Sequence, residues 1–212
     1  MKKYIAELIG TFALVFCGTG AIIIQQETAL VTHVGVAITF GLIVSAMIYA
    51  FGDISGAHLN PAVTIALSVA KRFSAKEILP YVVSQALGAF LASFMLKFLF
   101  PANEFLGSTL PANSAIQSFV LEVILTFFLM LVIFQMSVAT DNKKMFAGTA
   151  IGSVVLLEAL FAGPISGASM NPIRSIAPAL VSQHMEHLWV YVCAPLGGAF
   201  LAVLVNFFFD RN

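Results

Sequence analysis

The stretch Ser55-Gly56-Ala57-His58-Leu59-Asn60-Pro61-Ala62 recurs in the second half of the chain as Ser166-Gly167-Ala168-Ser169-Met170-Asn171-Pro172-Ile173. Each copy lies between strongly apolar segments and is followed by a mostly apolar run of about ten residues, whereas a helix needs roughly 20 residues to cross a bilayer. Asn is a favoured helix N-cap, and Pro is tolerated at the first helical position. The repeat therefore predicts two short helices, at 60–70 and 171–181, that begin inside a membrane protein and frame a pore.

The composition supports a membrane location. Hydrophobic residues make up 60% and charged residues 9% of the 212 residues, and the mean hydropathy is +0.99. A soluble domain carries about 25% charged residues, so the composition indicates a multi-pass membrane protein. The net charge of zero suggests no nucleic-acid partner. Cys17 and Cys193 lie in apolar segments and are interpreted as packing residues rather than as a disulfide.

The pattern of reactive residues indicates no enzyme. The sequence contains no cluster with metal-ligand spacing and no evident pair of a nucleophile and a base. We therefore expect no catalytic residues, no cofactor and no metal, and we expect the bilayer and small neutral solutes as partners.

Six apolar segments are long enough to cross the membrane. We interpret them as full spans over residues 4–24, 34–51, 79–100, 116–138, 146–163 and 188–209. Turn-forming and charged residues connect them, as in Gln25-Gln26-Glu27 and Asp141-Asn142-Lys143-Lys144. Met1-Lys2-Lys3 followed by an apolar run resembles a signal peptide, but Glu7 interrupts the run, so we expect an uncleaved first span. Residues 1–212 are interpreted as a single transmembrane domain.

The similarity between the two halves extends beyond the Asn-Pro stretches. Glu7-Leu8-Ile9-Gly10-Thr11-Phe12 resembles Glu122-Val123-Ile124-Leu125-Thr126-Phe127, in the first and fourth spans. Because each half contains an odd number of spans, the second half must enter the membrane in the opposite orientation. Inverted repeats with broken helices are an established membrane architecture. We therefore divide the chain into inverted repeats of residues 1–100 and 116–209.

The basic residues indicate the orientation. Lys97 lies near the outer end of the third span, and Arg174 lies within the second short helix. The other basic residues fall on one side of the predicted topology: Lys2, Lys3, Lys71, Arg72, Lys76, Lys143, Lys144 and Arg211. The positive-inside rule assigns this side, with both termini, to the cytoplasm. We expect the chain in a plasma membrane, specifically a bacterial inner membrane.

The two predicted short helices would meet at their N-termini. Each N-terminus presents unpaired N–H groups and about half a positive charge. An Asn N-cap accepts a backbone hydrogen bond through its side-chain oxygen, which leaves its NH2 group to donate into the lumen. Asn60 and Asn171 are therefore predicted to offer two donors to a passing oxygen atom, while the positive field repels cations and protons. This field argues against a cation channel.

The chain resembles the aquaporin (major intrinsic protein) family over essentially its whole length, and within it the nodulin-26-like and related bacterial channels. The resemblance rests on Gly41-Leu42-Ile43-Val44 and on residues 56–65 and 161–172. It implies an all-α fold of six transmembrane helices plus two re-entrant half-helices around an hourglass pore. It also implies a homotetramer and passive diffusion of water and small uncharged solutes. Ile173 departs from the family's usual Asn-Pro-Ala, and we expect its bulk to alter packing or to narrow the mid-pore.

The resemblance further implies a narrow outer selectivity filter of four residues. Arg174 supplies its charge, and ionisable residues within a membrane are functional by default. By spacing from the Asn-Pro motifs, its partners are Phe40, Ala159 and Ala168. Strict water channels of the family usually carry a histidine at the Ala159 position. The two alanines therefore predict a wider, amphipathic opening suited to glycerol, urea or neutral metalloid hydroxides as well as water.

Other positions leave a strict water channel open as the alternative. Ser175 and Ala179 resemble the residues of water channels, whereas Tyr191 and Val192 resemble those of the branches with broader solutes. A secondary transporter is a further alternative of another class, because inverted repeats and intramembrane carboxylates occur there too.

The buried acids are interpreted as structural. Glu7 and Glu122 occupy matched positions, where a carboxylate can bind the loop N–H groups that broken helices leave unpaired. Glu158 either points at the lumen or caps backbone in the same way, and the sequence does not decide between the two. His58 is predicted to line the inner vestibule, and Asp53 to contribute a charge near the inner mouth.

Overall fold

The computed structural model describes residues 1–209, so Arg211, assigned above to the cytoplasmic side, lies outside the described residues. Those residues form helices and no strand, and six helical segments are long and apolar enough to cross a membrane. The predicted all-α membrane fold is confirmed. The helices are α1 (Lys2–Thr28), α2 (Thr32–Ser55), α3 (Pro61–Val69), a 3-10 turn η1 (Ala75–Glu77), α4 (Ile78–Leu99), α5 (Ala115–Ser137), α6 (Asp141–Lys144), α7 (Ala147–Ser166), α8 (Pro172–Ser182) and α9 (Leu188–Phe209).

The helix ends differ from the sequence prediction at two connections. Gln25-Gln26-Glu27, predicted to be a linker, belongs to α1, which ends where Ala29 adopts a left-handed conformation with φ 58°. Asp141-Asn142-Lys143-Lys144, also predicted to be a linker, forms the short helix α6. Polarity marks where a chain leaves an apolar environment, whereas Gln, Glu and Lys are good helix formers that continue a helix beyond it.

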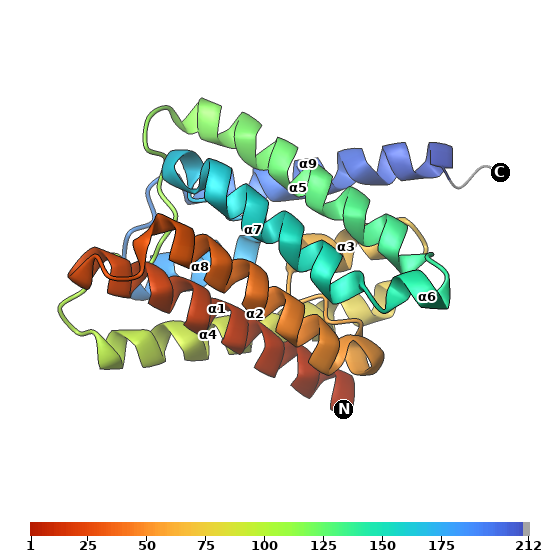
Figure 1. Cartoon of the computed structure of the whole chain (residues 1–212), viewed down its shortest axis with the longest axis horizontal. Helices are drawn as coiled ribbons and strands as arrows, with labels where there is room; N and C mark the ends of the chain where they lie inside the picture. Colours follow the sequence, from red (N-terminus) through yellow and green to blue (C-terminus); the bar gives the residue numbers. More distant parts are fainter. Residues whose placement is uncertain (210–212) are drawn as a thin grey trace.

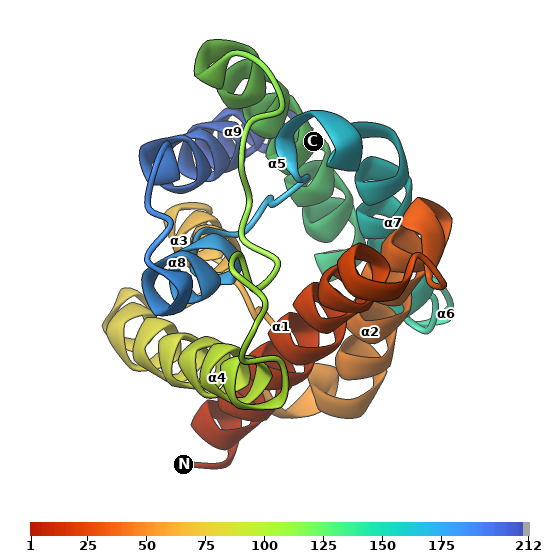
Figure 2. The same ribbon diagram turned by 90° about the vertical axis from the view of Figure 1, so that its left-hand side faces the viewer.

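The long helices run side by side and enclose the two short ones. α2 packs along α7, α1 along α4, and α5 along α9. α3 and α8 lie between α4 and α9 and contact both, and the end-on view of Figure 2 shows them filling the gap between these two helices. The N-terminus lies toward the same end of the molecule as α6 and the last described turns of α9 (Figure 1).

Two glycines permit close contacts between the backbones of long helices. A Cβ on Gly88 of α4 would overlap the backbone of α1 at Leu8, and a Cβ on Gly198 of α9 would overlap the backbone of α5 at Val123. Small residues that let backbones approach are typical of helix packing in membranes. The two contacts occupy matching positions in the two sequence halves.

Candidate functional site

The two Asn-Pro motifs begin α3 and α8. Asn60 Oδ1 accepts a hydrogen bond from the N–H of Ala62 at 2.9 Å, and Asn171 Oδ1 accepts one from the N–H of Ile173 at 3.1 Å. Pro61 and Pro172 occupy the first helical positions, where their missing N–H would have no partner anyway. Local sequence therefore determines where both short helices start.

The same asparagines link the short helices to each other. Asn60 Nδ2 donates to the carbonyl of Met170 at 2.7 Å, and Asn171 Nδ2 donates to the carbonyl of Leu59 at 2.9 Å. A carboxamide NH2 group carries two hydrogens. Each asparagine therefore uses one hydrogen to bind the opposite motif, so at most one remains for a solute in the cavity that both residues line. This corrects the expectation that the whole NH2 group is free.

The loops that lead into the short helices are strained at matching positions. Ala57 and Leu59 have φ values of 46° and 52°, and Ala168 and Met170 have values of 41° and 53°. A non-glycine residue in a sparsely populated backbone region costs about 1–3 kcal/mol and persists only where the surroundings hold it. The two buried glutamates supply the hydrogen bonds that hold these loops.

Glu7 holds the first loop from α1 and is fully buried. Its carboxylate accepts hydrogen bonds from the hydroxyl of Ser55 at 2.7 Å, the N–H of His58 at 2.9 Å and the N–H of Leu59 at 2.8 Å. Gln85 of α4 donates a fourth bond at 2.8 Å. Both carboxylate oxygens are therefore engaged.

Glu122 holds the second loop from α5 and is also fully buried. It accepts hydrogen bonds from the hydroxyl of Ser166 at 2.7 Å and from the N–H groups of Ser169 and Met170 at 2.8 and 2.9 Å. The two acids thus bind equivalent groups in the two loops.

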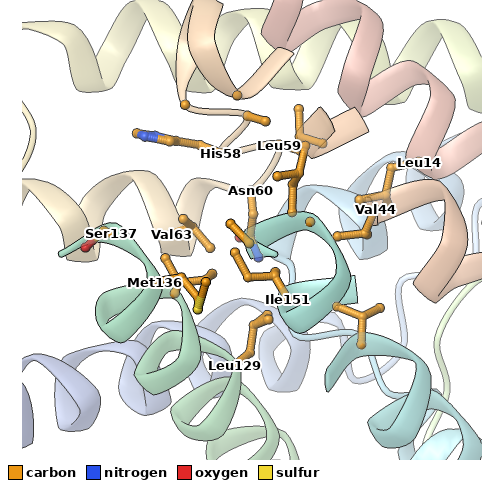
Figure 3. A pocket seen from close by; sticks show the side chains of 18 of the residues that line it. Leu14, Val44, His58, Leu59, Asn60, Val63, Leu129, Met136, Ser137 and Ile151 are labelled. Carbon is orange, nitrogen blue, oxygen red and sulfur yellow. The ribbon is translucent and has the colours of Figure 1, made fainter. Parts of the chain in front are cut away.

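A cavity of about 810 Å³ passes the point where the short helices meet. Its lining includes Asp53 and Lys144, Asn60 of the first motif, and Phe40 and Arg174. Figure 3 shows Asn60 among apolar side chains from several helices, including those labelled Val44, Val63, Leu129 and Ile151. The walls are therefore mostly apolar, with a few polar groups.

His58 lines the same cavity and is held by an aromatic cluster. Its Nδ1 lies 3.1 Å from the hydroxyl of Thr64, and its ring centroid lies 4.7 Å from that of Phe73 and 5.1 Å from that of Tyr81. The ring is thereby fixed against one wall of the cavity (Figure 3).

Arg174 is the buried charge of the site, with 1% of its surface exposed. Its guanidinium carbon lies 5.1 Å from the centroid of the Phe40 ring, and its Nη1 donates to the carbonyl of Gly107 at 2.9 Å. Its Nε and Nη2 atoms have no hydrogen-bond partner in the described part of the chain. The guanidinium group is therefore buried with only one of its three nitrogen atoms hydrogen-bonded to the described residues.

The remaining predicted site residues fall into two groups. Phe40, Ala168 and Arg174 line the cavity, whereas Ala159 lies in the same apolar cluster as Phe40 without lining the cavity. Ala62 and Ile173, the third residues of the two motifs, are buried in apolar clusters behind the wall. The bulk of Ile173 is therefore accommodated by packing among other side chains rather than in the lumen.

The sequence analysis missed the residues of the loop between α4 and α5 that hold Arg174 and α8. The carbonyl of Gly107 binds Arg174, and a buried hydroxyl chain runs from Thr109 to Ser175 at 2.8 Å and on to Ser169 at 2.6 Å. Ser169 then donates to the carbonyl of Asn171 at 3.0 Å. Gly107 adopts a φ of 70°, but a glycine in a loop signals only a turn and does not indicate which side chain its carbonyl binds.

The fold has six membrane-crossing helices, two opposed half-helices and a mostly apolar cavity that a few polar groups line. These features define a multi-pass membrane channel. The major intrinsic protein family matches residues 1–206. Aquaporin NIP1-1 of Oryza sativa subsp. japonica is 48% identical over 203 residues, which cover 94% of this chain and 71% of the relative. Nodulin-26 of Glycine max is 45% identical over 204 residues, covering 94% and 74%.

A solved structure agrees with these relatives. The aquaglyceroporin from Plasmodium falciparum superposes with a TM-score of 0.87 at 28% identity, covering 99% of this chain and 95% of that one. The chain therefore belongs to the major intrinsic protein, or aquaporin, family, as the sequence resemblance indicated. It is a channel for water and small neutral solutes and not an enzyme or a secondary transporter.

Proposed function

We propose that transport is passive and extends beyond water to glycerol, urea or neutral metalloid hydroxides, with protons and ions excluded. One observation carries this proposal: the guanidinium of Arg174 faces the ring of Phe40 at 5.1 Å, and the other two filter positions hold only the methyl groups of Ala159 and Ala168. A structural neighbour described as an aquaglyceroporin supports a pore that passes more than water.

The filter would recognise solutes by matching two kinds of surface. The unpaired N–H donors of Arg174 bind hydroxyl or carbonyl oxygens, and the ring of Phe40 contacts CH groups. The positive charge of Arg174, buried where screening is weak, repels cations. Asn60 and Asn171 then donate to the oxygen of each molecule that passes the mid-pore, and the N-termini of α3 and α8 add about half a positive charge each.

The wider organisation is also part of the proposal. Matched contacts of Glu7 and Glu122 with their loops support inverted repeats of residues 1–100 and 116–209. The N-terminus and α6 lie toward one end of the molecule, which supports termini on the cytoplasmic side (Figure 1). We assign the chain to a plasma membrane as a homotetramer. The relatives reported above come from plants and Plasmodium, so they do not support the bacterial membrane expected from the sequence.

Replacing Ala159 by His tests the breadth of the pore. The ring would fill the space beside Phe40 and bring a polar group toward Arg174, as in strict water channels of the family. Water flux should persist, while glycerol and urea permeability should fall by roughly tenfold or more, since a misfit of one small group in a pocket is worth about 1–3 kcal/mol. The measurement is stopped-flow swelling of proteoliposomes under water, glycerol and urea gradients.

Two outcomes contradict the proposal. A wild-type channel that conducts water but neither glycerol nor urea is a strict water channel. An unchanged ratio of water to solute permeability in Ala159→His removes Ala159 from the filter. The exposed Leu157, on the adjoining position of α7, gives the control Leu157→Met, which should match the wild type in every gradient.

A further inference from the structure

Glu158 lies on the inward face of α7, next to the predicted filter residue Ala159. The buried residues of this helix include Val155, Glu158 and Ala162, whereas Leu157 and Phe161 are exposed. Residues three, four and seven apart lie on one helix face. Ile151 and Val155, which precede Glu158 by two turns and one turn, both line the cavity. The side chain of Glu158 therefore projects from the same face as the cavity wall.

The carboxyl group of Glu158 is not used to hold the backbone. Its Oε2 is buried and has no hydrogen-bond partner among the described residues, in contrast to the fully engaged carboxylate of Glu7. Leaving a buried polar atom without a partner is costly, so each case calls for a physical explanation. Of the two roles that the sequence left open, backbone capping is therefore not the one observed.

The exposure of Glu158 matches that of the residues around the lumen. Glu158 keeps 8% of its surface accessible, the same fraction as Phe40 and Val155, which line the cavity. Neighbouring inward residues that pack only against protein, such as Ala162, are fully buried. Glu158, like Ala159, is not among the residues that line the cavity of about 810 Å³, so its inward position on α7 and its 8% accessible surface are the observations that support a place beside the lumen.

We propose that Glu158 is a further solute-recognition residue, which accepts hydrogen bonds from the hydroxyl groups of small neutral polyols such as glycerol. This inference rests on the proposed function, because it requires a pore that admits solutes larger than water. A carboxyl group accepts hydrogen bonds whether it is ionised or protonated. Arg174 supplies unpaired donors, so a hydroxyl group, which both donates and accepts, finds a complement in each residue.

The internal repeat supplies a comparison for this role. The position that matches Glu158 in the first half is Met47, a partly buried side chain packed against the central apolar cluster. The first half therefore shows that the fold tolerates an unbranched apolar side chain of similar length here. Glu158→Met removes the carboxyl group while keeping most of the volume.

The test compares water and glycerol permeability in proteoliposomes that contain the wild-type channel, Glu158→Met, Glu158→Ala or Glu158→Gln. Loss of one hydrogen bond to the solute should lower the glycerol-to-water ratio by roughly three- to tenfold in Glu158→Met. Glu158→Ala distinguishes a recognition effect from a size effect. Because alanine is smaller, a size effect alone would raise the glycerol-to-water ratio, whereas loss of recognition should lower it. Glu158→Gln keeps an accepting oxygen and should stay within about twofold of the wild type.

The outcomes distinguish failure of the recognition role of Glu158 from failure of the proposed function. An unchanged or increased ratio in a folded Glu158→Ala or Glu158→Met channel overturns the recognition role while the proposed function stands. A fall in the ratio in Glu158→Gln as large as in Glu158→Met also overturns it, because the accepting oxygen then has no effect. A wild-type channel impermeable to glycerol overturns this inference, and one impermeable to urea as well also overturns the proposed function. The control Leu157→Met should leave the ratio unchanged.

Discussion

The two loops that lead into the short helices are held by the same kind of acid but not equally well. Glu7 accepts four hydrogen bonds, from Ser55, His58, Leu59 and Gln85. Glu122 accepts three, from the equivalent residues Ser166, Ser169 and Met170. The backbone on which they act is nearly the same, with φ of 52° at Leu59 and 53° at Met170. The second loop therefore keeps the same backbone conformation as the first although its acid accepts one hydrogen bond fewer.

The difference comes from the helix that packs behind each loop. Gln85 of α4 corresponds to Pro195 of α9, which cannot donate to Glu122. Tyr81 of α4 donates to the carbonyl of Ser55 at 2.9 Å, whereas the buried hydroxyl of the corresponding Tyr191 has no partner among the described residues. The ionisable residues that have a buried side-chain atom without a partner, among residues 1–209, all belong to the second half: Glu158, Arg174, His184 and Tyr191. In the first half, the buried side-chain atoms without a partner belong to the uncharged residues Thr11, Gln85 and Ser93, so the two halves differ in the kind of group that is left unpaired.

The largest expected effect comes from removing the two acids. Glu7→Leu leaves four donors without their acceptor and Glu122→Leu leaves three, and each buried unsatisfied group costs about 1–3 kcal/mol. Both variants should lose water conduction, and Glu7→Leu should unfold at the lower temperature. Thermal unfolding in detergent and water permeability of proteoliposomes provide the measurements. The exposed Ile124 on α5 gives the control Ile124→Val, which should match the wild type. A lower unfolding temperature for Glu122→Leu than for Glu7→Leu would contradict the inferred difference between the two loops.

A smaller effect is expected when the second motif is made to resemble the first. Arg174 and Val63 occupy matching positions after the two asparagines. Arg174→Val therefore removes the charge and retains the dipoles at the N-termini of α3 and α8. The repulsion between a unit charge and a cation about 8 Å away is about 2 kcal/mol at an effective dielectric constant of 20. If this repulsion is lost from the barrier to permeation, the leak of protons and cations should rise roughly thirtyfold. Proton-sensitive dye in liposomes measures the leak, with water permeability as the check on folding. A leak that stays at the wild-type level while water flux is preserved would remove Arg174 as the filter charge.

The smallest effect separates the two tyrosines. Tyr81→Phe removes a buried hydrogen bond and should destabilise the protein by about 1 kcal/mol, which lowers the melting temperature by about 2–4 °C for a chain of this size. Tyr191→Phe removes a hydroxyl group that has no partner and should leave the melting temperature unchanged or slightly higher. Each variant is the matched control for the other. An equal decrease in melting temperature in the two variants would show that the Tyr191 hydroxyl has a partner, such as a bound water, and would contradict this difference between the halves.

The sequence by itself determined the membrane class, the helices and the two motifs, because these depend on local properties. Long apolar runs specify spans, and Asn followed by Pro specifies a helix start, whatever surrounds them. The duplication also marked Glu7 and Glu122 as a pair, since both lie in matched segments. Arg174 was recognisable because a charge within an apolar segment is rarely tolerated without a function.

Only the tertiary structure decided which groups meet. The mutual hydrogen bonds of Asn60 and Asn171, and the carbonyl of Gly107 on Arg174, join residues far apart in the chain through single atoms whose positions no local pattern encodes. Whether a buried carboxyl group is engaged, as in Glu7, or free, as in Glu158, likewise depends on the neighbouring helix and not on its own segment. Helix propensity and hydropathy act over neighbouring residues, whereas hydrogen-bond satisfaction is settled when distant segments pack together.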